Sequence, residues 1–271
     1  MIYLSSFLLS GKKVKNPNIY PYNVFAKKDE RLVVFSPITV LYGDNGSGKS
    51  TLLNIIANTL EVEGKEHATN NKFGMIQYFM QYVSECRYGL GEDEEGNALR
   101  CLPGRSRYIK SEDILYEIKK IEQEAVLEEG YIYEHVRRGM PKEMIEALKK
   151  SDKTAEQLGY IKFGQEKYSN GETTMQMLMD YLEPDALYLL DEPEVSLSPA
   201  NQVRLAEEIN KLARLLNCQF IIATHSPFML GTLNAKIYNL DSEDMPEAKW
   251  SELENVRYFY DFFKKHETEF E

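Results

Sequence analysis

Continuous apolar runs form the most regular pattern in the second half of the chain. Residues 186–190 (ALYLL) and 220–223 (FIIA) are uninterrupted apolar runs, and residues 236–240 read as a further strand. Parallel strands that are covered on both faces show this pattern. Residues 198–216 begin with a serine and a proline, which favour a helix start, and then place apolar residues at helical spacing. This alternation of strand and helix predicts an α/β fold with a mainly parallel central sheet.

The first 42 residues are rich in β-forming residues. Residues 1–9, 31–35 and 38–42 read as strands, with Pro37 separating the last two. We expect this N-terminal part to contain antiparallel strands. Residues 51–60 then place leucine and isoleucine on a wide face, which predicts the first long helix.

A charged segment with helical periodicity interrupts this pattern at residues 85–165. Ser111 is a predicted helix N-cap, Pro141 opens another short helix, and the acidic, glycine-bounded residues 89–96 predict an exposed loop. We therefore predict one domain over residues 1–271, with a helical lobe inserted at about 85–165.

The last predicted element is a C-terminal helix. Ser251 and Glu254 have the spacing of a capping box, in which each side chain bonds the backbone N–H of the other residue. The helix would carry Val256, Tyr260 and Phe263.

Composition changes this picture little but excludes some classes of protein. Of 271 residues, 43% are hydrophobic and 28% charged, as in soluble globular proteins. No apolar run approaches the ~20 residues that cross a bilayer. The three cysteines lack paired spacing, which favours a reducing, cytoplasmic compartment. The net charge of −11 argues against a global electrostatic attraction to nucleic acid or to an anionic membrane.

Between a predicted strand and a predicted helix lies the sequence GDNGSGKS, which fits the phosphate-binding loop G-x-x-x-x-G-K-[ST]. Its glycines let backbone N–H groups surround a polyphosphate at the start of a helix. Lys49 would reach the β- and γ-phosphates, and the Ser50 hydroxyl would bind Mg²⁺. The segment predicts a nucleoside triphosphate site. The predicted nucleotide-binding residues are Gly43, Asp44, Asn45, Gly46, Ser47, Gly48, Lys49, Ser50 and Thr51.

Two acidic residues follow the apolar run at 187–190. The carboxyl end of a buried parallel strand is where ligands bind in open α/β sheets. Asp191 would hold Mg²⁺ through water, and Glu192 would orient or deprotonate the water that attacks the γ-phosphate. Together with the phosphate loop, this pair predicts hydrolysis of the triphosphate.

Two further segments have groups that could bind an anion. Ser169, Asn170, Gly171 and Glu172 precede a helix predicted at 173–181, so a hydroxyl, a glycine amide and a helix N-terminus come together. His225 follows the strand at 220–223 and would donate a hydrogen bond to the γ-phosphate.

These segments, taken in order, resemble the ATP-binding-cassette (ABC) ATPases. GDNGSGKS resembles the Walker A loop, YSNGE the signature, LYLLDEPE the Walker B strand with its catalytic glutamate, SLSP the D-loop, and ATHSP the histidine switch. The resemblance spans about residues 35–240 and implies an ABC ATPase head with ATP as substrate and Mg²⁺ as cofactor. The family's glutamine loop is matched least well: Glu112 stands in a suitable place as a metal-site residue, and Gln77 and Gln81 are rivals.

Departures from the transporter pattern indicate a branch of the family. Asn170 and Glu172 replace the usual glycine and glutamine of the signature, and Ser198 replaces the D-loop aspartate. With DEPE and THSP, this resembles the soluble chromosome-maintenance, recombination-repair and phage-defence ATPases, and small stand-alone bacterial ATPases in particular.

The resemblance implies a head-to-tail dimer of two copies around two ATP molecules. The signature of one copy, Ser169 to Glu172, would complete the γ-phosphate site of the other, and hydrolysis would release the dimer. A separate effector protein is the expected partner. Nucleic acid remains an open possibility, and no membrane segment is expected.

Three other interpretations remain open. The first is the nucleotide-binding subunit of a membrane transporter, and the departures above argue against it. The second is an ATP-gated interaction module with negligible turnover, and the Asp191–Glu192 pair argues against that. A small-molecule kinase shares the phosphate loop but does not need the later motifs.

Overall fold

The structure is a computed structural model, and it describes residues 1–270 except 17, 29, 67–76, 94 and 121–169. The chain divides into two compact units. The first comprises Met1–Ser111, Leu182–Val195 and Gln202–Glu271, and the second comprises Glu112–Tyr181 and Ser196–Asn201. None of the helices in the described part of the chain combines the length and apolar character needed to span a bilayer.

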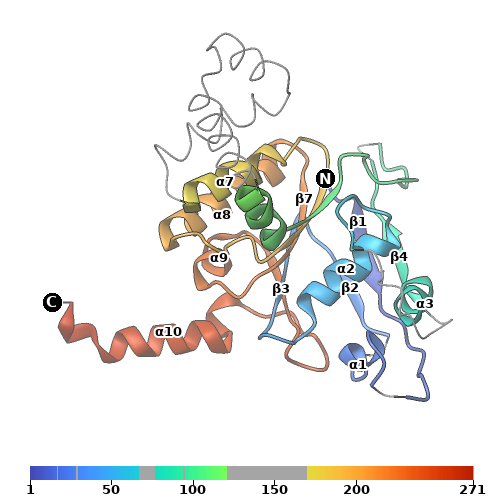
Figure 1. The fold of residues 1–271 in the computed structure, drawn as a ribbon, viewed down its shortest axis with the longest axis horizontal. Coiled ribbons are helices and arrows are strands. Elements are labelled where there is room, and N and C mark those ends of the chain that lie inside the picture. The colour runs from blue at the N-terminus through green and yellow to red at the C-terminus, as the bar shows by residue number, and fades with distance from the viewer. Residues whose placement is uncertain (17, 29, 67–76, 94, 121–169, 271) are drawn as a thin grey trace, which may run out of the picture. The chain divides into compact units, whose positions relative to one another are not determined.

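A five-stranded parallel sheet forms the centre of the first unit (Figure 1). Its order is β5–β6–β7–β3–β8, and every neighbouring pair is parallel. Burial of β3, β6 and β7 along their whole length explains their continuous apolar runs. The predicted α/β fold with a mainly parallel sheet is confirmed. The strands are β3 (Ile38–Tyr42), β5 (Arg107–Lys110), β6 (Leu187–Asp191), β7 (Gln219–Ala223) and β8 (Lys236–Asn239).

A second, antiparallel sheet has the order β2–β1–β4. Its strands are β1 (Leu4–Leu8), β2 (Leu32–Val34) and β4 (Arg87–Leu90). The predicted N-terminal antiparallel strands are therefore confirmed. Their partner β4 takes the first two residues of the loop predicted at 89–96, so that loop boundary was wrong.

The two long helices α2 (Lys49–Thr59) and α8 (Pro199–Leu215) of the first unit bury apolar side chains. In α2, four of the predicted apolar residues are fully buried, and the helix contacts β5, β6 and β7. In α8, the residues from Gln202 onward belong to this unit and bury Leu205, Ile209 and Ala213. The shorter helices are α1 (Tyr22–Phe25), α3 (Tyr78–Glu85), α9 (Pro227–Thr232), η1 (Trp250–Glu252) and η2 (Glu267–Glu269).

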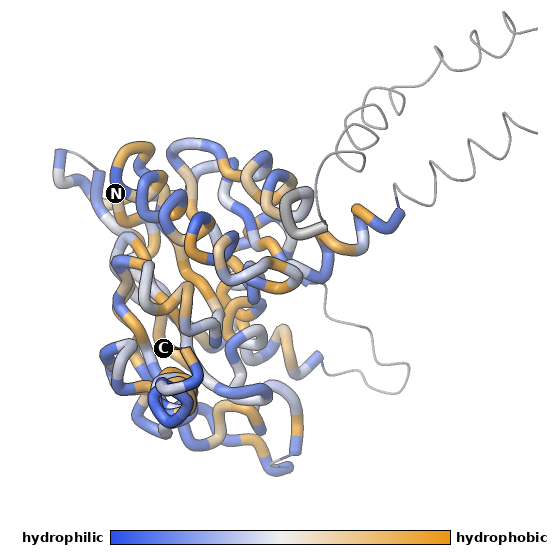
Figure 2. The backbone as a smooth tube through the Cα atoms, turned by 90° about the vertical axis from the view of Figure 1, so that its left-hand side faces the viewer, coloured by the Kyte–Doolittle hydropathy of each residue, from blue (hydrophilic) through white to orange (hydrophobic). Residues whose placement is uncertain are grey.

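The main core of the first unit brings together residues far apart in sequence. Side chains of β1, β3, β6 and β7 pack with α2 and α3 in one apolar cluster. Figure 2 shows hydrophobic segments gathered in the interior and hydrophilic ones on the outside. Gln219 is a fully buried polar residue that joins the two sheets: its Oε1 accepts from the backbone N–H groups of Tyr3 and Leu4 at 2.8 Å.

The C-terminal helix α10 (Glu254–Lys265) forms where predicted but begins differently. Ser251 lies in η1, the buried Leu253 occupies the N-cap position, and that cap makes no side-chain hydrogen bond. The predicted capping box is therefore wrong. Figure 1 shows α10 extending away from the strands, and Val256 is its one buried residue. Several aromatic side chains of α10, Tyr260 and Phe263 among them, are exposed.

The second unit contains α7 (Asn170–Asp180) and the helical residues 112–120. Ile114 and Ile118 are buried, as their spacing predicts, and the Tyr181 hydroxyl donates to Glu117 at 2.6 Å. The hydroxyl of Ser198 accepts from the backbone N–H of Asn201, which is the predicted cap of α8. The predicted continuation of the first helix beyond residue 120, and the helix at Pro141, lie outside the described residues.

Candidate functional site

The carboxyl ends of the five parallel strands meet at one edge of the sheet. Asp191 of β6 pairs in register with Lys110 of β5 and with Ala223 of β7. Leu41 of β3 pairs with the same Ala223, and Tyr42 with Asn239 of β8. The segments that follow these strands therefore start side by side, where open α/β sheets bind their ligands. The phosphate loop, Asp191 to Glu192, and His225 all lie in such segments.

The predicted phosphate loop joins β3 to α2. Gly46 has a φ of 86° and Gly48 a φ of 100°, which glycine adopts without strain. Gly48 is also the N-cap of α2, and a Cβ there would lie 2.6 Å from the Val24 side chain. All predicted nucleotide-binding residues, 43–51, occupy this loop and the first turn of α2. The loop thus has the strand–loop–helix setting that its motif requires.

Lys49 is buried inside the loop that precedes it. Its Nζ donates to the carbonyl oxygens of Gly43 at 2.7 Å and Asp44 at 3.1 Å, and its side chain is 4% exposed. The same Nζ lies 3.9 Å from Glu192 Oε1. The positive charge of Lys49 therefore lies at the position where this motif binds phosphate groups.

Two residues that the sequence did not single out fix the loop from outside. Lys28 is buried, and its Nζ donates to the Ser47 carbonyl at 2.9 Å. Burial lowers the pKa of this lysine, and the nearby Asp241 carboxylate partly offsets that effect. Asp241 Oδ1 accepts from the Asp44 backbone N–H at 2.9 Å. The loop is thereby tied to the segments after α1 and β8.

Ser50 and Asp191 meet as predicted for a magnesium site. The Ser50 hydroxyl donates to Asp191 Oδ1 at 3.0 Å, and the Tyr108 hydroxyl donates to Oδ2 at 3.1 Å. Burial raises the pKa of Asp191, while these two hydrogen bonds lower it. Hydroxyl and carboxylate oxygens are the ligands that Mg²⁺ prefers, so this pair fits the ion. Sequence reasoning missed Tyr108, which lies in the unforeseen strand β5.

Glu192 has a strained backbone held by three hydrogen bonds. Its φ of 47° is in the left-handed region, which is uncommon for a residue with a side chain. Its N–H donates to Ala223 O at 2.9 Å, and its carbonyl accepts from the Ser111 hydroxyl at 2.6 Å and from the Val195 N–H at 3.1 Å. Ser111 was predicted as an N-cap, and its hydroxyl instead makes this contact. The Glu192 side chain is 31% exposed, so solvent reaches it.

His225 is directly beside Glu192. Its Nδ1 lies 3.4 Å from Glu192 Oε1 and 3.9 Å from Glu194 Oε1. Its carbonyl accepts from the Asn255 side chain of α10 at 3.0 Å. Of the three predicted catalytic residues, Lys49 and His225 thus lie 3.9 Å and 3.4 Å from one carboxylate oxygen of the third, Glu192. Sequence reasoning quoted Glu194 within DEPE but gave it no role.

The remaining predicted residues lie in the second unit or outside the described residues. Asn170, Gly171 and Glu172 form the start of α7, three residues earlier than the predicted helix start, and Ser169 is outside the described part. Glu112 is exposed at the beginning of the second unit. The signature and the metal-site role of Glu112 stay predictions. Gln81, a rival of Glu112 for the glutamine-loop position, donates a hydrogen bond to Glu85 within α3.

Three aromatic residues, Tyr20, Tyr22 and Phe25, lie about twenty residues before the phosphate loop. Tyr22 and Phe25 are buried in the core. Tyr20 is 47% exposed, stacks on Phe79 with ring centroids 6.0 Å apart, and has its hydroxyl 3.4 Å from Thr51 Oγ1. Tyr20 is therefore the ring of the three that a ligand in the loop can reach.

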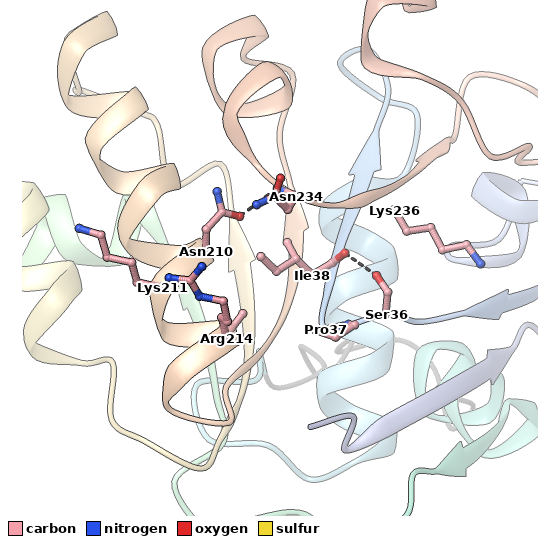
Figure 3. A pocket seen from close by; sticks show the side chains of 9 residues that line it. Ser36, Pro37, Ile38, Asn210, Lys211, Arg214, Asn234 and Lys236 are labelled. Carbon is pink, nitrogen blue, oxygen red and sulfur yellow. Dashed lines mark hydrogen bonds between the residues drawn. The ribbon is translucent and has the colours of Figure 1, made fainter.

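A surface pocket of about 510 Å³ lies elsewhere. It borders the amino ends of β3 and β8 and the end of α8, at the edge opposite the phosphate loop. Figure 3 shows its Lys211 and Lys236 pointing in opposite directions, and each is paired with a glutamate. The pocket has no part in the site above.

Two solved structures are similar to the chain at low sequence identity. The SMC head domain from Thermotoga maritima is 14% identical with a TM-score of 0.43, and covers 88% of this chain and 94% of that chain. A nucleotide-free ATP-binding cassette from an ABC transporter is 15% identical with a TM-score of 0.42, and covers 95% of each chain. No curated protein matched the chain.

One family model matched residues 78–231, a range that contains the signature, the Asp191–Glu192 pair and His225. The matched range is more than half of the chain. It agrees with the ABC-type P-loop ATPase that the ordered motifs predict. The chain therefore belongs to the family described as "AAA domain, putative AbiEii toxin, Type IV TA system".

Proposed function

We propose that the protein binds Mg·ATP at the carboxyl edge of its parallel sheet and hydrolyses it to ADP and phosphate. The observation that carries this proposal is the position of Glu192. Its Oε1 lies 3.4 Å from His225 Nδ1 and 3.9 Å from Lys49 Nζ, beside the hydrogen-bonded Ser50–Asp191 pair. In this proposal these residues serve as the carboxylate base, the phosphate-binding cation and the magnesium pair of one site.

The residues have distinct roles in this reaction. The backbone N–H groups of the loop bind the phosphates, and Lys49 exchanges its carbonyl partners for phosphate oxygens. Glu192 accepts a proton from water as the water oxygen bonds to the γ-phosphorus and the bond to the ADP oxygen breaks. His225 donates a hydrogen bond to the γ-phosphate. Ser50 and Asp191 would hold Mg²⁺, and the chemistry that the ion supplies when bound is neutralisation of phosphate charge.

Tyr20 is the residue that we propose for stacking on adenine. Replacing an aromatic partner of a base by alanine costs about 1–3 kcal/mol. We expect Tyr20→Ala to raise the KM for ATP by about 10-fold with kcat unchanged, and Tyr20→Phe to match the wild type. Steady-state kinetics check this. Tyr258→Ala, which removes another exposed tyrosine, is the control, and an unchanged KM for Tyr20→Ala would remove Tyr20 from the site.

We further propose that ATP joins two copies head to tail, with Ser169 to Glu172 of one copy at the γ-phosphate of the other. Hydrolysis would then reverse an ATP-dependent interface, which acts as a switch for a separate effector protein. The family description names a toxin of a type IV toxin–antitoxin system. This favours a phage-defence role, or the related DNA-maintenance role, over a transporter subunit.

Phosphate release from Mg·ATP by the wild-type chain tests the proposal. We expect saturable turnover that disappears when EDTA removes Mg²⁺. ATP binding without phosphate release would instead support the ATP-gated module. Absence of ATP binding would refute the site itself.

A further inference from the structure

Glu194 is a buried carboxylate that the mechanism above does not use. Its side chain is 6% exposed, and burial raises its pKa. Its Oε1 accepts from the Thr224 hydroxyl at 2.5 Å and from the His225 backbone N–H at 3.3 Å. Its Oε2 is buried without a hydrogen bond among the described residues. Burying a carboxylate in this way is costly, so its position calls for an explanation.

The contacts of Glu194 begin a chain that shapes the segment after β7. Thr224 is fully buried, and its Oγ1 also accepts from the Ser226 N–H at 3.1 Å. The Ser226 hydroxyl accepts from the Met229 N–H at 3.2 Å, which caps α9, and it donates to Gln202 at 2.6 Å. His225 lies between these two anchored residues. The direction of its ring therefore depends on the hydrogen bonds that Glu194 accepts.

The imidazole itself has two carboxylates near its Nδ1. His225 Nδ1 is buried, 3.4 Å from Glu192 Oε1 and 3.9 Å from Glu194 Oε1, while 46% of the side chain is exposed. One edge of the ring thus faces the carboxylates and the remainder is open to a ligand. A shift of the Thr224–His225 peptide would move this ring away from Glu192.

We propose that Glu194 is a positioning residue, which holds the Thr224–His225 peptide so that the imidazole stays beside Glu192 and the γ-phosphate. This inference rests on the proposed ATPase function. The feature required is the acceptor oxygen, because both donors bind the same Oε1. Glutamine keeps that oxygen and alanine removes it. A residue that merely stabilises the fold would affect turnover independently of His225.

A double-mutant cycle tests this dependence. We expect Glu194→Ala to lower kcat by about 10-fold with KM for ATP within about 2-fold, and His225→Ala to lower kcat by about 100-fold, the range of a lost hydrogen-bond donor to the charge of the transition state. The double variant should equal His225→Ala within about 2-fold, because residues that act as a unit are not additive. Glu194→Gln should retain kcat within about 3-fold, since it keeps the acceptor. A double variant that multiplies the two losses overturns the proposal.

A second readout does not depend on turnover. His225 is one of four histidines, so ¹⁵N-histidine labelling with His225→Ala as reference assigns its ring signals. We expect Glu194→Ala to shift these signals and Glu194→Gln to leave them near their wild-type positions. Unchanged signals in Glu194→Ala overturn the proposal. If Glu194→Ala does not fold, Thr224→Val removes the hydroxyl that donates to Glu194. It should lower kcat and shift the His225 ring signals, as expected for Glu194→Ala. A wild-type chain without phosphate release refutes the ATPase function and leaves this measurement to decide the role of Glu194.

Discussion

Glu192→Gln is expected to abolish ATP turnover and to accumulate an ATP-bound dimer. Loss of a general base costs about 10²–10⁴-fold in rate, so kcat should fall by at least about 100-fold. Glutamine has the shape of glutamate, and the loop, Lys49 and the Ser50–Asp191 pair are unchanged. ATP affinity should therefore stay near that of the wild type. With hydrolysis blocked, the interface that depends on the γ-phosphate should persist.

Light scattering with and without Mg·ATP measures this result. The mass should rise from 31.4 kDa to about twice that value only when ATP is present. The matched control is Glu192→Gln combined with Lys49→Met, which we expect to stay monomeric because it cannot hold the nucleotide. A Glu192→Gln chain that binds ATP yet stays monomeric contradicts the homodimer and points to a different partner. The nucleotide site would stand in that case.

The parts of the fold that sequence predicts are those in which burial leaves a local pattern. Strands β3, β6 and β7 are covered on both faces and read as apolar runs, so their positions were predicted to within a residue or so. The loop at 43–50 was predicted because its glycines and lysine have fixed spacing. Since parallel strands end at one edge, the meeting of Lys49, Asp191, Glu192 and His225 followed from the strand assignments alone.

Two edge strands, β4 and β5, were missed for the opposite reason, whereas the edge strands β2 and β8 were predicted. Strand β4 (RYGL) and strand β5 (RYIK) each have a neighbour on one side only, and both carry charged residues. Arg107 of β5 pairs with Glu63, and Lys110 pairs with Glu66. In the sequence, charged residues such as these are typical of a solvated loop. An edge position tolerates such residues, and no periodic signal then marks the strand.

The supporting contacts of the site were missed because they are tertiary. Lys28 reaches Ser47, Tyr108 reaches Asp191, and Glu194 reaches Thr224, each across a long sequence separation. Lys28 and Tyr108 belong to no motif with a known spacing. Glu194 lies within DEPE, where its carboxylate follows the Asp191–Glu192 pair after a proline, but sequence reasoning alone assigned it no role.

Lys49→Met is expected to weaken ATP binding by at least about 100-fold and to remove turnover. Truncating one partner of a buried, hydrogen-bonded charge pair costs about 2–5 kcal/mol. Lys49 is the cation that the loop motif assigns to the phosphates, and methionine keeps most of its length without the charge. Calorimetric titration of Mg·ATP measures the affinity, and the unfolding temperature verifies that the variant is folded.

A second buried lysine on the same loop makes the test specific. In this structure Lys49 bonds the carbonyls of Gly43 and Asp44, so its loss would also loosen the loop. Lys28 likewise bonds a loop carbonyl, that of Ser47, but the motif gives it no phosphate contact. Lys28→Met therefore reproduces the loosening alone, and it should weaken ATP binding by under about 5-fold, the effect of one hydrogen bond. Equal losses in the two variants would mean that Lys49 acts by holding the loop, and the direct phosphate contact would be refuted.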